Sequence, residues 1–337
     1  MSVVLAHVVY YTAVAAHPYA ALTPEVVLDA CDASGLRADG RLLPLNSYEN
    51  RVYQVWLEDG SARVLKFYRP GRWSFGQIEE EHAFARELAE REIPVVAPAH
   101  TGEHAGFLFA VYPRRGGRTP NLDDPKALEW IGRFIGRIHA AGAARPFQLR
   151  PSLNAETFGD EPRAFLLDRN FLPADLLESW KAATQQALAG VRSCFQNAGK
   201  TRSIRLHGDC HPGNILWTDH GEMSGPHFVD LDDARMGPAM QDLWMLLSGE
   251  RAAMSRQLHH VLAGYGDFAE LDRRELHLVE ALRTLRLIHY SAWIGRRWDD
   301  PAFPAAFPWF NTQRYWQDRI LELREQIALM EEEPLEP

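Results

Sequence analysis

The stretches HGDCHPGNILW, residues 207–217, and FVDLDDA, residues 228–234, decide the fold of this chain. The first places Asp209 and Asn214 in a D-x-x-x-x-N spacing across a Pro-Gly turn. The second places Asp230 at the end of a β-type run. Short strands joined by tight turns can bring these two carboxylates and the carboxamide to one point. The plainer alternative is a turn that uses Asp, Asn, Gly and Pro for backbone reasons alone.

Phosphoryl transfer from magnesium-bound ATP needs such a set of side chains. One carboxylate orients and deprotonates the acceptor hydroxyl, while an amide oxygen and a second carboxylate hold magnesium on the phosphates. The D-x-x-x-x-N spacing equals that of the protein-kinase catalytic loop, and Asp230 stands where that superfamily has its metal-binding aspartate. The residues therefore predict kinase chemistry, with Asp209 and Asp230 as catalytic residues and Asn214 and Asp230 as magnesium ligands.

A kinase also needs a lysine that neutralises the donor phosphates, and Lys66 is the candidate. It lies within an apolar run, where a buried charge requires a partner. We predict that this partner is Glu81 on the helix expected at 77–91, rather than Glu79 or Glu80, because few positions of a helix face inward. In the alternative, Lys66 faces solvent on an edge strand.

The segment LNSYEN, residues 45–50, precedes the run 52–57, where a loop that covers phosphates belongs. It lacks the expected glycines. Asn46, Ser47 and Asn50 can still form a turn that exposes backbone N–H groups to an anion. An ordinary turn is an equally good interpretation, because Asn and Ser favour turns.

Two further segments flank these motifs. Asp242 can anchor the predicted catalytic loop by accepting its backbone N–H groups, with His207 packed nearby, or it can be an acidic residue in the first turn of a helix. The aromatic and proline-rich stretch from Trp293 to Phe310 is either core packing or one wall of an acceptor groove.

Composition excludes several classes of protein. The 337 residues include 36 basic and 45 acidic side chains, a formal net charge of −9, which argues against binding to a nucleic-acid backbone. Three cysteines without a C-x-x-C pair exclude a disulfide framework or a cysteine-rich zinc site and fit a reducing cytoplasm. No apolar run reaches the roughly 18 residues that span a bilayer. The apolar N-terminus lacks the positive region of a secretory signal, so we expect an extension there.

Pro and Gly residues at 113–117 mark the best domain boundary. The expected organisation is an N-terminal extension (1–22), a small β-rich nucleotide-binding lobe (23–112), a larger helical catalytic and acceptor-binding lobe (113–330) and an acidic tail (331–337). The fold class is thus α+β, with a ligand cleft between the lobes. Helices are predicted at 24–34, 77–91, 128–138, 173–197, 238–248 and 273–298, and strands at 52–57, 63–68, 107–112, 214–217 and 227–230, the last two around a turn with Asp219 and Gly221.

The motifs at 207–217 and 228–234 resemble those of the aminoglycoside phosphotransferase and choline kinase family. LNSYENRVYQ (45–54), KFYRP (66–70), DLDDARMGPAMQDLWMLL (230–247) and DPAFPAAFPWF (300–310) are more narrowly similar to the bacterial stress response kinase A group. The resemblance covers about residues 23–316. It implies a bilobal protein-kinase-like fold and a cytoplasmic, monomeric Ser/Thr protein kinase that uses Mg²⁺ and ATP and protects stressed cells.

By position, the resemblance makes Asp209 the proton acceptor and assigns Asn214 and Asp230 to magnesium. It also makes Lys66 and Glu81 a nucleotide-binding pair and places Ser47 in the loop that contacts ATP.

Two departures leave the acceptor open. Gly208 precedes Asp209, where many regulated protein kinases have Arg, and the short segment between Asp230 and Asp242 leaves no room for a phosphorylatable activation loop. From the residues alone a small alcohol or amine acceptor is favoured, whereas a Ser/Thr protein substrate rests on the resemblance.

A nucleotide-binding pseudokinase scaffold is a further alternative. An aspartyl-phosphate hydrolase would need strands that alternate with helices from the start, and zinc at His207, Cys210 and His211 would need a second ligand pair.

Overall fold

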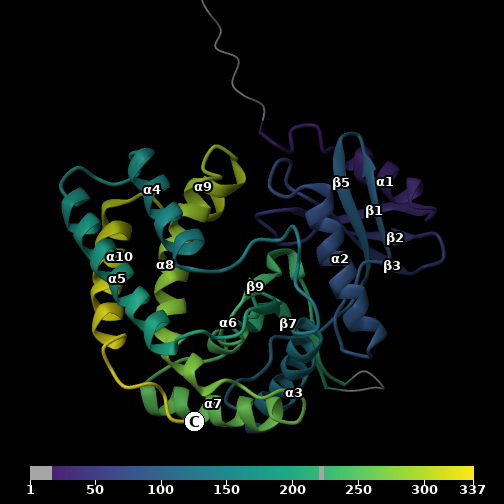
Figure 1. Ribbon diagram of the computed structural model, residues 1–337. Helices are drawn as coiled ribbons and strands as arrows, with labels where there is room; N and C mark the ends of the chain where they lie inside the picture. The colour runs from purple at the N-terminus through teal and green to yellow at the C-terminus, as the bar shows by residue number, and fades with distance from the viewer. Residues whose placement is uncertain (1–16, 220–223) are drawn as a thin grey trace, which may run out of the picture.

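A computed structural model describes residues 17–219 and 224–337 of the chain. It has two lobes, a small one built on an antiparallel sheet and a larger helical one (Figure 1). In the first lobe the elements are α1 (Pro24–Ala33), β1 (Ala38–Pro44), β2 (Arg51–Leu57), β3 (Ala62–Phe67), α2 (Phe75–Glu90), β4 (His100–His104) and β5 (Phe107–Pro113). The predicted α+β, protein-kinase-like fold class is confirmed.

The helical lobe contains further short strands. Its elements are α3 (Pro125–Gly142), α4 (Glu161–Asp168), α5 (Leu177–Ala198), β6 (Ile204–Leu206), β7 (Ile215–Thr218), β8 (Gly225–Phe228), β9 (Arg235–Gly237), α6 (Met240–Trp244), α7 (Arg251–Tyr265), α8 (Val279–Gly295), α9 (Ala302–Ala306) and α10 (Gln313–Leu329). No helix in the described ranges has the length and apolar character that crossing a membrane requires.

The five-stranded sheet of the small lobe has the order β1-β2-β3-β5-β4, with every neighbouring pair antiparallel. The predicted hairpin joins β2 to β3, and Gly60 takes a φ of 80° in its turn. Lys66 lies in β3 opposite Val52 of β2 and Ala110 of β5. Because β3 is central, the alternative in which Lys66 sits on an edge strand is wrong.

Several sequence predictions need correction at the edges of the elements. The strand 51–57 is not the first one, since β1 precedes it, and β4 was also missed. Most residues of these two edge strands are exposed or half-buried, so neither carries the alternating apolar pattern that marks a strand. The helix expected at 238–248 is reduced to α6, and the one expected at 273–298 begins as a 3₁₀ turn before α8.

Helices α3 and α7 pack unusually closely in the large lobe because glycines face the contact. A Cβ atom built on Gly264 would lie 1.8 Å from the carbonyl oxygen of Glu129, and one on Gly132 would lie 2.0 Å from that of Val261. The two backbones therefore touch directly. The core of this lobe also includes Trp180 and Trp316, which meet edge to face.

Two small antiparallel ribbons, β7–β8 and β6–β9, support the segments singled out in the sequence. The first matches the predicted strand pair, while the second was not predicted. Gly221 of the predicted turn and residues 1–16 of the predicted extension lie outside the described residues. The boundary between residues 112 and 113 stays a prediction.

Candidate active site

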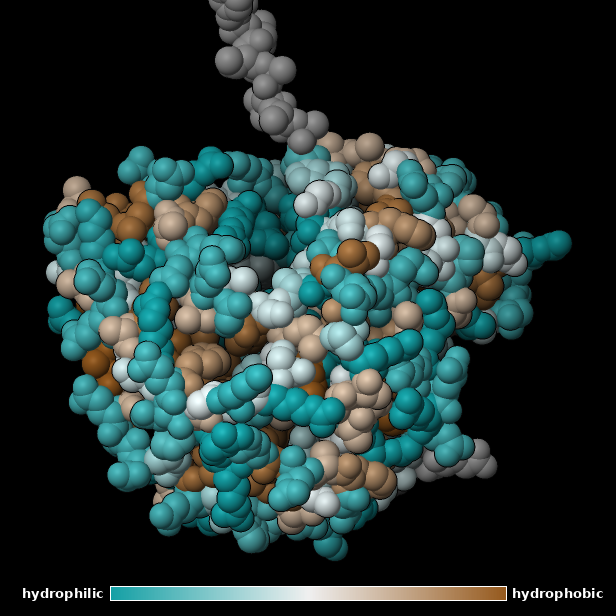
Figure 2. Space-filling model, viewed as in Figure 1, coloured by the Kyte–Doolittle hydropathy of each residue, from teal (hydrophilic) through white to brown (hydrophobic). Residues whose placement is uncertain are grey.

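A cavity of about 780 Å³ opens between the two lobes. Figure 2 shows the surface hollowed between α9 and the small lobe, with hydrophilic residues around the opening. Residues from both lobes form its wall, including all six that the sequence singled out for nucleotide, metal or catalysis: Ser47, Lys66, Glu81, Asp209, Asn214 and Asp230.

The loop that carries Asp209 follows β6, and hydrogen bonds to Asp242 on α6 fix its backbone. The fully buried Asp242 carboxylate accepts the backbone N–H groups of His207 and Gly208, both at 2.8 Å, and lies 3.1 Å from Nε2 of His139. The prediction that Asp242 anchors this loop is thus confirmed. Gly208 has a φ of 87°, and a Cβ there would lie 2.1 Å from the carbonyl oxygen of Asp233. This close approach explains why glycine precedes Asp209.

Asp209 points into the cavity beside two basic side chains. Nη1 of Arg286 on α8 lies 2.6 Å from its Oδ1, and Nε2 of His211 lies 3.5 Å from its Oδ2. Burial alone would raise the pKa of Asp209, but the hydrogen bond to His211 and the charge of Arg286 outweigh burial and lower this pKa. The carboxylate is therefore ionised at neutral pH and able to accept a hydrogen bond from a hydroxyl group.

Asn214 and Asp230 flank the neighbouring β7–β8 ribbon, Asn214 directly before β7 and Asp230 two residues after β8. Nδ2 of Asn214 donates to the carbonyl oxygen of Asp209 at 2.9 Å, and the backbone N–H of Val229 donates to the Asn214 carbonyl at 3.0 Å. Asp230 has a φ of 60°, which is rare for a non-glycine residue and recurs at functional sites. Its side chain is 53% exposed in the cavity wall.

This donor set fits a magnesium ion. Mg²⁺ prefers oxygen ligands and commonly takes only one or two from a protein, the others being phosphate oxygens and water. The amide oxygen of Asn214 and the carboxylate of Asp230 match that pattern. Within the described ranges no group of three or more His, Cys, Asp or Glu side chains is placed so that it could hold a metal ion. A magnesium ion at Asn214 and Asp230 would therefore need phosphate oxygens or water as further ligands.

Lys66 is buried and pairs with two aspartates, not with the predicted glutamate. Its Nζ lies 2.9 Å from Oδ1 of Asp230 and 3.3 Å from Oδ1 of Asp232. No ion pair in the described part of the chain joins Lys66 to Glu81, whose carboxylate approaches Arg150 at 3.9 Å instead. The two residues still interact through their charges, since Glu81 acts to raise the pKa of Lys66 and Lys66 acts to lower that of Glu81, and their role as a nucleotide-binding pair stays a prediction.

Glu81 is nevertheless the inward-facing glutamate of its run. Its exposed fraction is 2%, and burial raises its pKa to about 7. Glu80 instead accepts backbone N–H groups of residues 148–150 at the surface, and the Glu79 side chain is 39% exposed.

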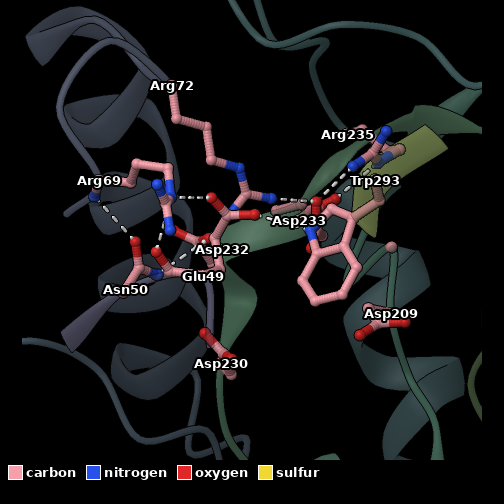
Figure 3. Close-up of polar contacts among 12 residues, drawn as sticks. Glu49, Asn50, Arg69, Arg72, Asp209, Asp230, Asp232, Asp233, Arg235 and Trp293 are labelled. Carbon is pink, nitrogen blue, oxygen red and sulfur yellow. Dashed lines mark hydrogen bonds and ion pairs between the residues drawn. The ribbon is translucent and has the colours of Figure 1, made fainter. Parts of the chain in front are cut away.

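Arg72 and Asp232 form a buried network behind Asp230 (Figure 3). The Arg72 guanidinium contacts Asp232 and lies 2.8 Å from Asp233, and Nδ2 of Asn50 donates to Asp232 at 3.2 Å. Burial opposes ionisation of Asp232, but Arg72 and then Lys66 lower its pKa to about 2. The network ties the segment after β8 in the large lobe to the small lobe, and no local sequence pattern reveals it.

The loop 45–50 lies between β1 and β2. Oγ of Ser47 accepts the Val52 N–H at 3.2 Å, so it shapes the turn, while Glu49 reaches across to the large lobe. There the Glu49 carboxylate accepts Nε1–H of Trp293 at 2.7 Å and pairs with Arg297 at 2.6 Å. A second link between the lobes joins Asp300 to Arg69 at 2.6 Å.

The aromatic stretch that starts at Trp293 divides between the cavity wall and the core, and a role in acceptor binding stays a prediction. Trp293 and Phe307 line the cavity, whereas Trp298 packs on Phe310 next to the core.

Comparison with known proteins agrees with this geometry. The model of the phosphotransferase enzyme family matches residues 41–279. The chain belongs to the phosphotransferase enzyme family. Stress response kinase A of Salmonella choleraesuis (strain SC-B67) is 45% identical over 326 residues, covering 95% of this phosphotransferase and 97% of that relative. A relative from Salmonella typhimurium (strain LT2), named serine/threonine protein kinase RdoA, has the same identity and coverage.

Among solved structures, an amicoumacin kinase in complex with AMP-PNP, Ca²⁺ and amicoumacin has the same fold. Its TM-score is 0.67 at 19% sequence identity, covering 92% of this chain and 95% of that one. The cavity of this phosphotransferase thus combines a buried lysine, an ionised aspartate and two oxygen donors for a metal, which are the groups that phosphoryl transfer requires.

Proposed function

We propose that this phosphotransferase is an ATP-dependent Ser/Thr protein kinase of the stress response kinase A type, which transfers the γ-phosphoryl group of ATP to a protein hydroxyl. The observation that carries the proposal is the convergence of Lys66, Asp209, Asn214 and Asp230 on one cavity between the lobes. The 45% identity to a relative named serine/threonine protein kinase RdoA supports a protein as acceptor. Three buried free thiols are consistent with action in a reducing cytoplasm.

In the proposed mechanism each side chain has one task. Asp209, held ionised, accepts a hydrogen bond from the acceptor hydroxyl and takes its proton as the new P–O bond forms. Lys66 has three N–H donors, so it can keep Asp232 as a partner while it binds nucleotide phosphates. Asn214 and Asp230 would hold magnesium. When bound, magnesium offsets the negative charge of the phosphates.

A second hollow supports an extended acceptor such as a peptide segment. It adjoins the main cavity through Tyr290, which lines both, and it has a volume of about 400 Å³. Trp309, 43% exposed, and Arg314 lie along it. A peptide whose hydroxyl reaches Asp209 would have a surface to follow there, whereas a small metabolite would not need one.

Replacement of Asp209 tests the mechanism. We expect Asp209→Asn to lower phosphoryl transfer by about 10²- to 10⁴-fold, the usual contribution of a general base. Binding of ATP, measured by calorimetry, should stay close to that of the unchanged enzyme. Asp160→Asn is the control, because Asp160 pairs with Arg192 on the surface. An Asp209→Asn enzyme with near-normal turnover would refute the mechanism.

A small hydroxyl-bearing metabolite is the second candidate acceptor. The same fold serves an amicoumacin kinase, and the segment after Asp230 runs through a 3₁₀ turn and β9 directly into α6, without a protruding activation loop. Incubation of the enzyme with labelled ATP and separate protein and metabolite fractions of a cell lysate distinguishes the two. Label in a protein band favours the first proposal, and label only in the metabolite fraction overturns it.

A further inference from the structure

The wall of the cavity around Asp209 has a charge pattern that selects among acceptors. We call the part formed by Asp209, His211, Arg286, Tyr290, Trp293 and Phe307 the acceptor wall. We propose that the acceptor carries a carboxylate or another anionic group next to its reactive hydroxyl, and that Arg286 binds this group. The inference rests on the proposed transfer at Asp209 and goes beyond it by naming the chemical class of the acceptor.

Arg286 has spare hydrogen-bond donors at the right place. A guanidinium group has five N–H donors in a planar fork that suits a carboxylate or phosphate. Only the contact of Nη1 with Asp209, at 2.6 Å, is found for Arg286 in the described ranges. The side chain is 37% exposed and faces the cavity. The remaining donors therefore lie next to the point where the acceptor hydroxyl must meet Asp209.

The carboxylates on or beside the acceptor wall are already paired with arginines. Asp209 pairs with Arg286, and Asp233 pairs with Arg235 at 2.6 Å. Glu49, which reaches the wall through Trp293, pairs with Arg297. Asp230, which also lines the cavity, pairs with Lys66, so each of these carboxylates already has a basic partner. A cationic amino alcohol would meet Arg286 beside an Asp209 carboxylate that is already paired, and like charges discriminate against such a ligand.

The other titratable and aromatic side chains of this region add no negative charge. His289, half-buried in the cavity wall, has its pKa lowered to about 3, first by burial and then by Arg235, so it is neutral at physiological pH. Tyr290 and Trp293 stack with their ring centres 5.6 Å apart and present an apolar surface. The acceptor wall thus holds the Asp209–Arg286 ion pair among aromatic rings, and Arg286 has guanidinium donors left over. It suits an acidic peptide segment or a hydroxy acid better than an amine.

A set of matched acceptors tests the proposal. The peptide arm uses a short peptide with one serine flanked by Asp and Glu, its Asn and Gln version and its Lys version; the metabolite arm uses a hydroxy acid and an amino alcohol. If the enzyme phosphorylates the peptides, we expect the acidic peptide to have a kcat/KM at least about tenfold above that of the Lys peptide. If it phosphorylates the metabolites, we expect the same ratio between the hydroxy acid and the amino alcohol. A tenfold ratio is the effect of one charge-assisted hydrogen bond. Arg286→Gln should reduce this ratio to near unity, and Arg286→Lys should retain part of it. Arg133→Gln on the distant face of α3 is the control.

Binding without transfer keeps the test independent of the proposed kinase activity. The same peptides with Ala in place of Ser are titrated into the enzyme in the presence of AMP-PNP and magnesium. Tighter binding of the acidic peptide that is lost in Arg286→Gln supports the proposal, whether or not any acceptor is phosphorylated. Absence of phosphorylation would refute only the proposed kinase activity. Equal or tighter binding of the basic peptide, or a preference that persists in Arg286→Gln, overturns it.

Discussion

Replacement of Asp242 by alanine should cost this phosphotransferase both stability and catalysis. The Asp242 carboxylate is fully buried and accepts two backbone N–H groups of the catalytic loop, each at 2.8 Å. Each buried donor left without a partner destabilises a fold by about 1–3 kcal/mol. Loss of the contact with His139 adds to this. We therefore expect Asp242→Ala to lower the free energy of unfolding by about 4 kcal/mol, a large part of the roughly 5–15 kcal/mol that is usual for a domain.

Urea unfolding followed by tryptophan fluorescence measures this change, and ATP turnover measures the effect on the loop. Asp242→Asn keeps one acceptor oxygen and should fall between the alanine variant and the unchanged protein. Asp267→Ala is the control. Asp267 pairs with Arg133 at the surface, where such pairs contribute only about 0–1 kcal/mol. If Asp242→Ala unfolds at the same urea concentration as the control and keeps full turnover, the loop does not depend on this carboxylate.

Four further substitutions test the site and the core beside it. The buried carboxylate of Glu275 accepts the backbone N–H of Met240 at the start of α6, at 2.9 Å. Burial raises the pKa of Glu275 from its ordinary 4.5 to about 7, so between these values the folded state holds a proton that the unfolded state releases. The free energy of unfolding therefore falls as pH rises through this window, by up to about 3 kcal/mol. Glu275→Gln should abolish that loss in urea titrations at about pH 5 and pH 8; an unchanged slope would contradict the assignment. Gly208→Ala should lower both the melting temperature and turnover, because its positive φ and the nearby carbonyl exclude a Cβ, and a variant with normal values of both would show that the loop adapts. Asp232→Asn should lower the free energy of unfolding by about 3–5 kcal/mol, because it removes the charge that compensates Lys66 and a buried arginine. Glu81→Gln replaces a carboxyl group that is already partly protonated at pH 7 by a neutral amide, so it should change the free energy of unfolding by less than about 1 kcal/mol. The reverse order in urea unfolding would refute this account.

The features that could be predicted from the sequence are those set by local spacing. Asp209, Asn214 and Asp230 lie close along the chain, in segments that flank one short ribbon, so turn and strand signals suffice to bring them together. The helical period also selected Glu81 as the inward glutamate of its run, which the burial confirms.

What could not be predicted depends on contacts between distant segments. Arg72 and Asp232 belong to different lobes, and no local pattern couples them. The same holds for Arg286, which reaches Asp209 from α8. The ion pair of Lys66 with Asp232 is of the same kind: helix phase places Glu81 inside, whereas the packing of the lobes sets which carboxylates lie nearest to Lys66.

The links across the cleft have a consequence for how the two lobes can move apart. Glu49 with Arg297, Asp300 with Arg69, and Arg72 with Asp233 all join the lobes through side chains that are mostly shielded from solvent. Breaking any one of these ion pairs alone would leave an unpaired charge in a poorly solvated place. The lobes are therefore expected to separate in a single cooperative step instead of opening gradually.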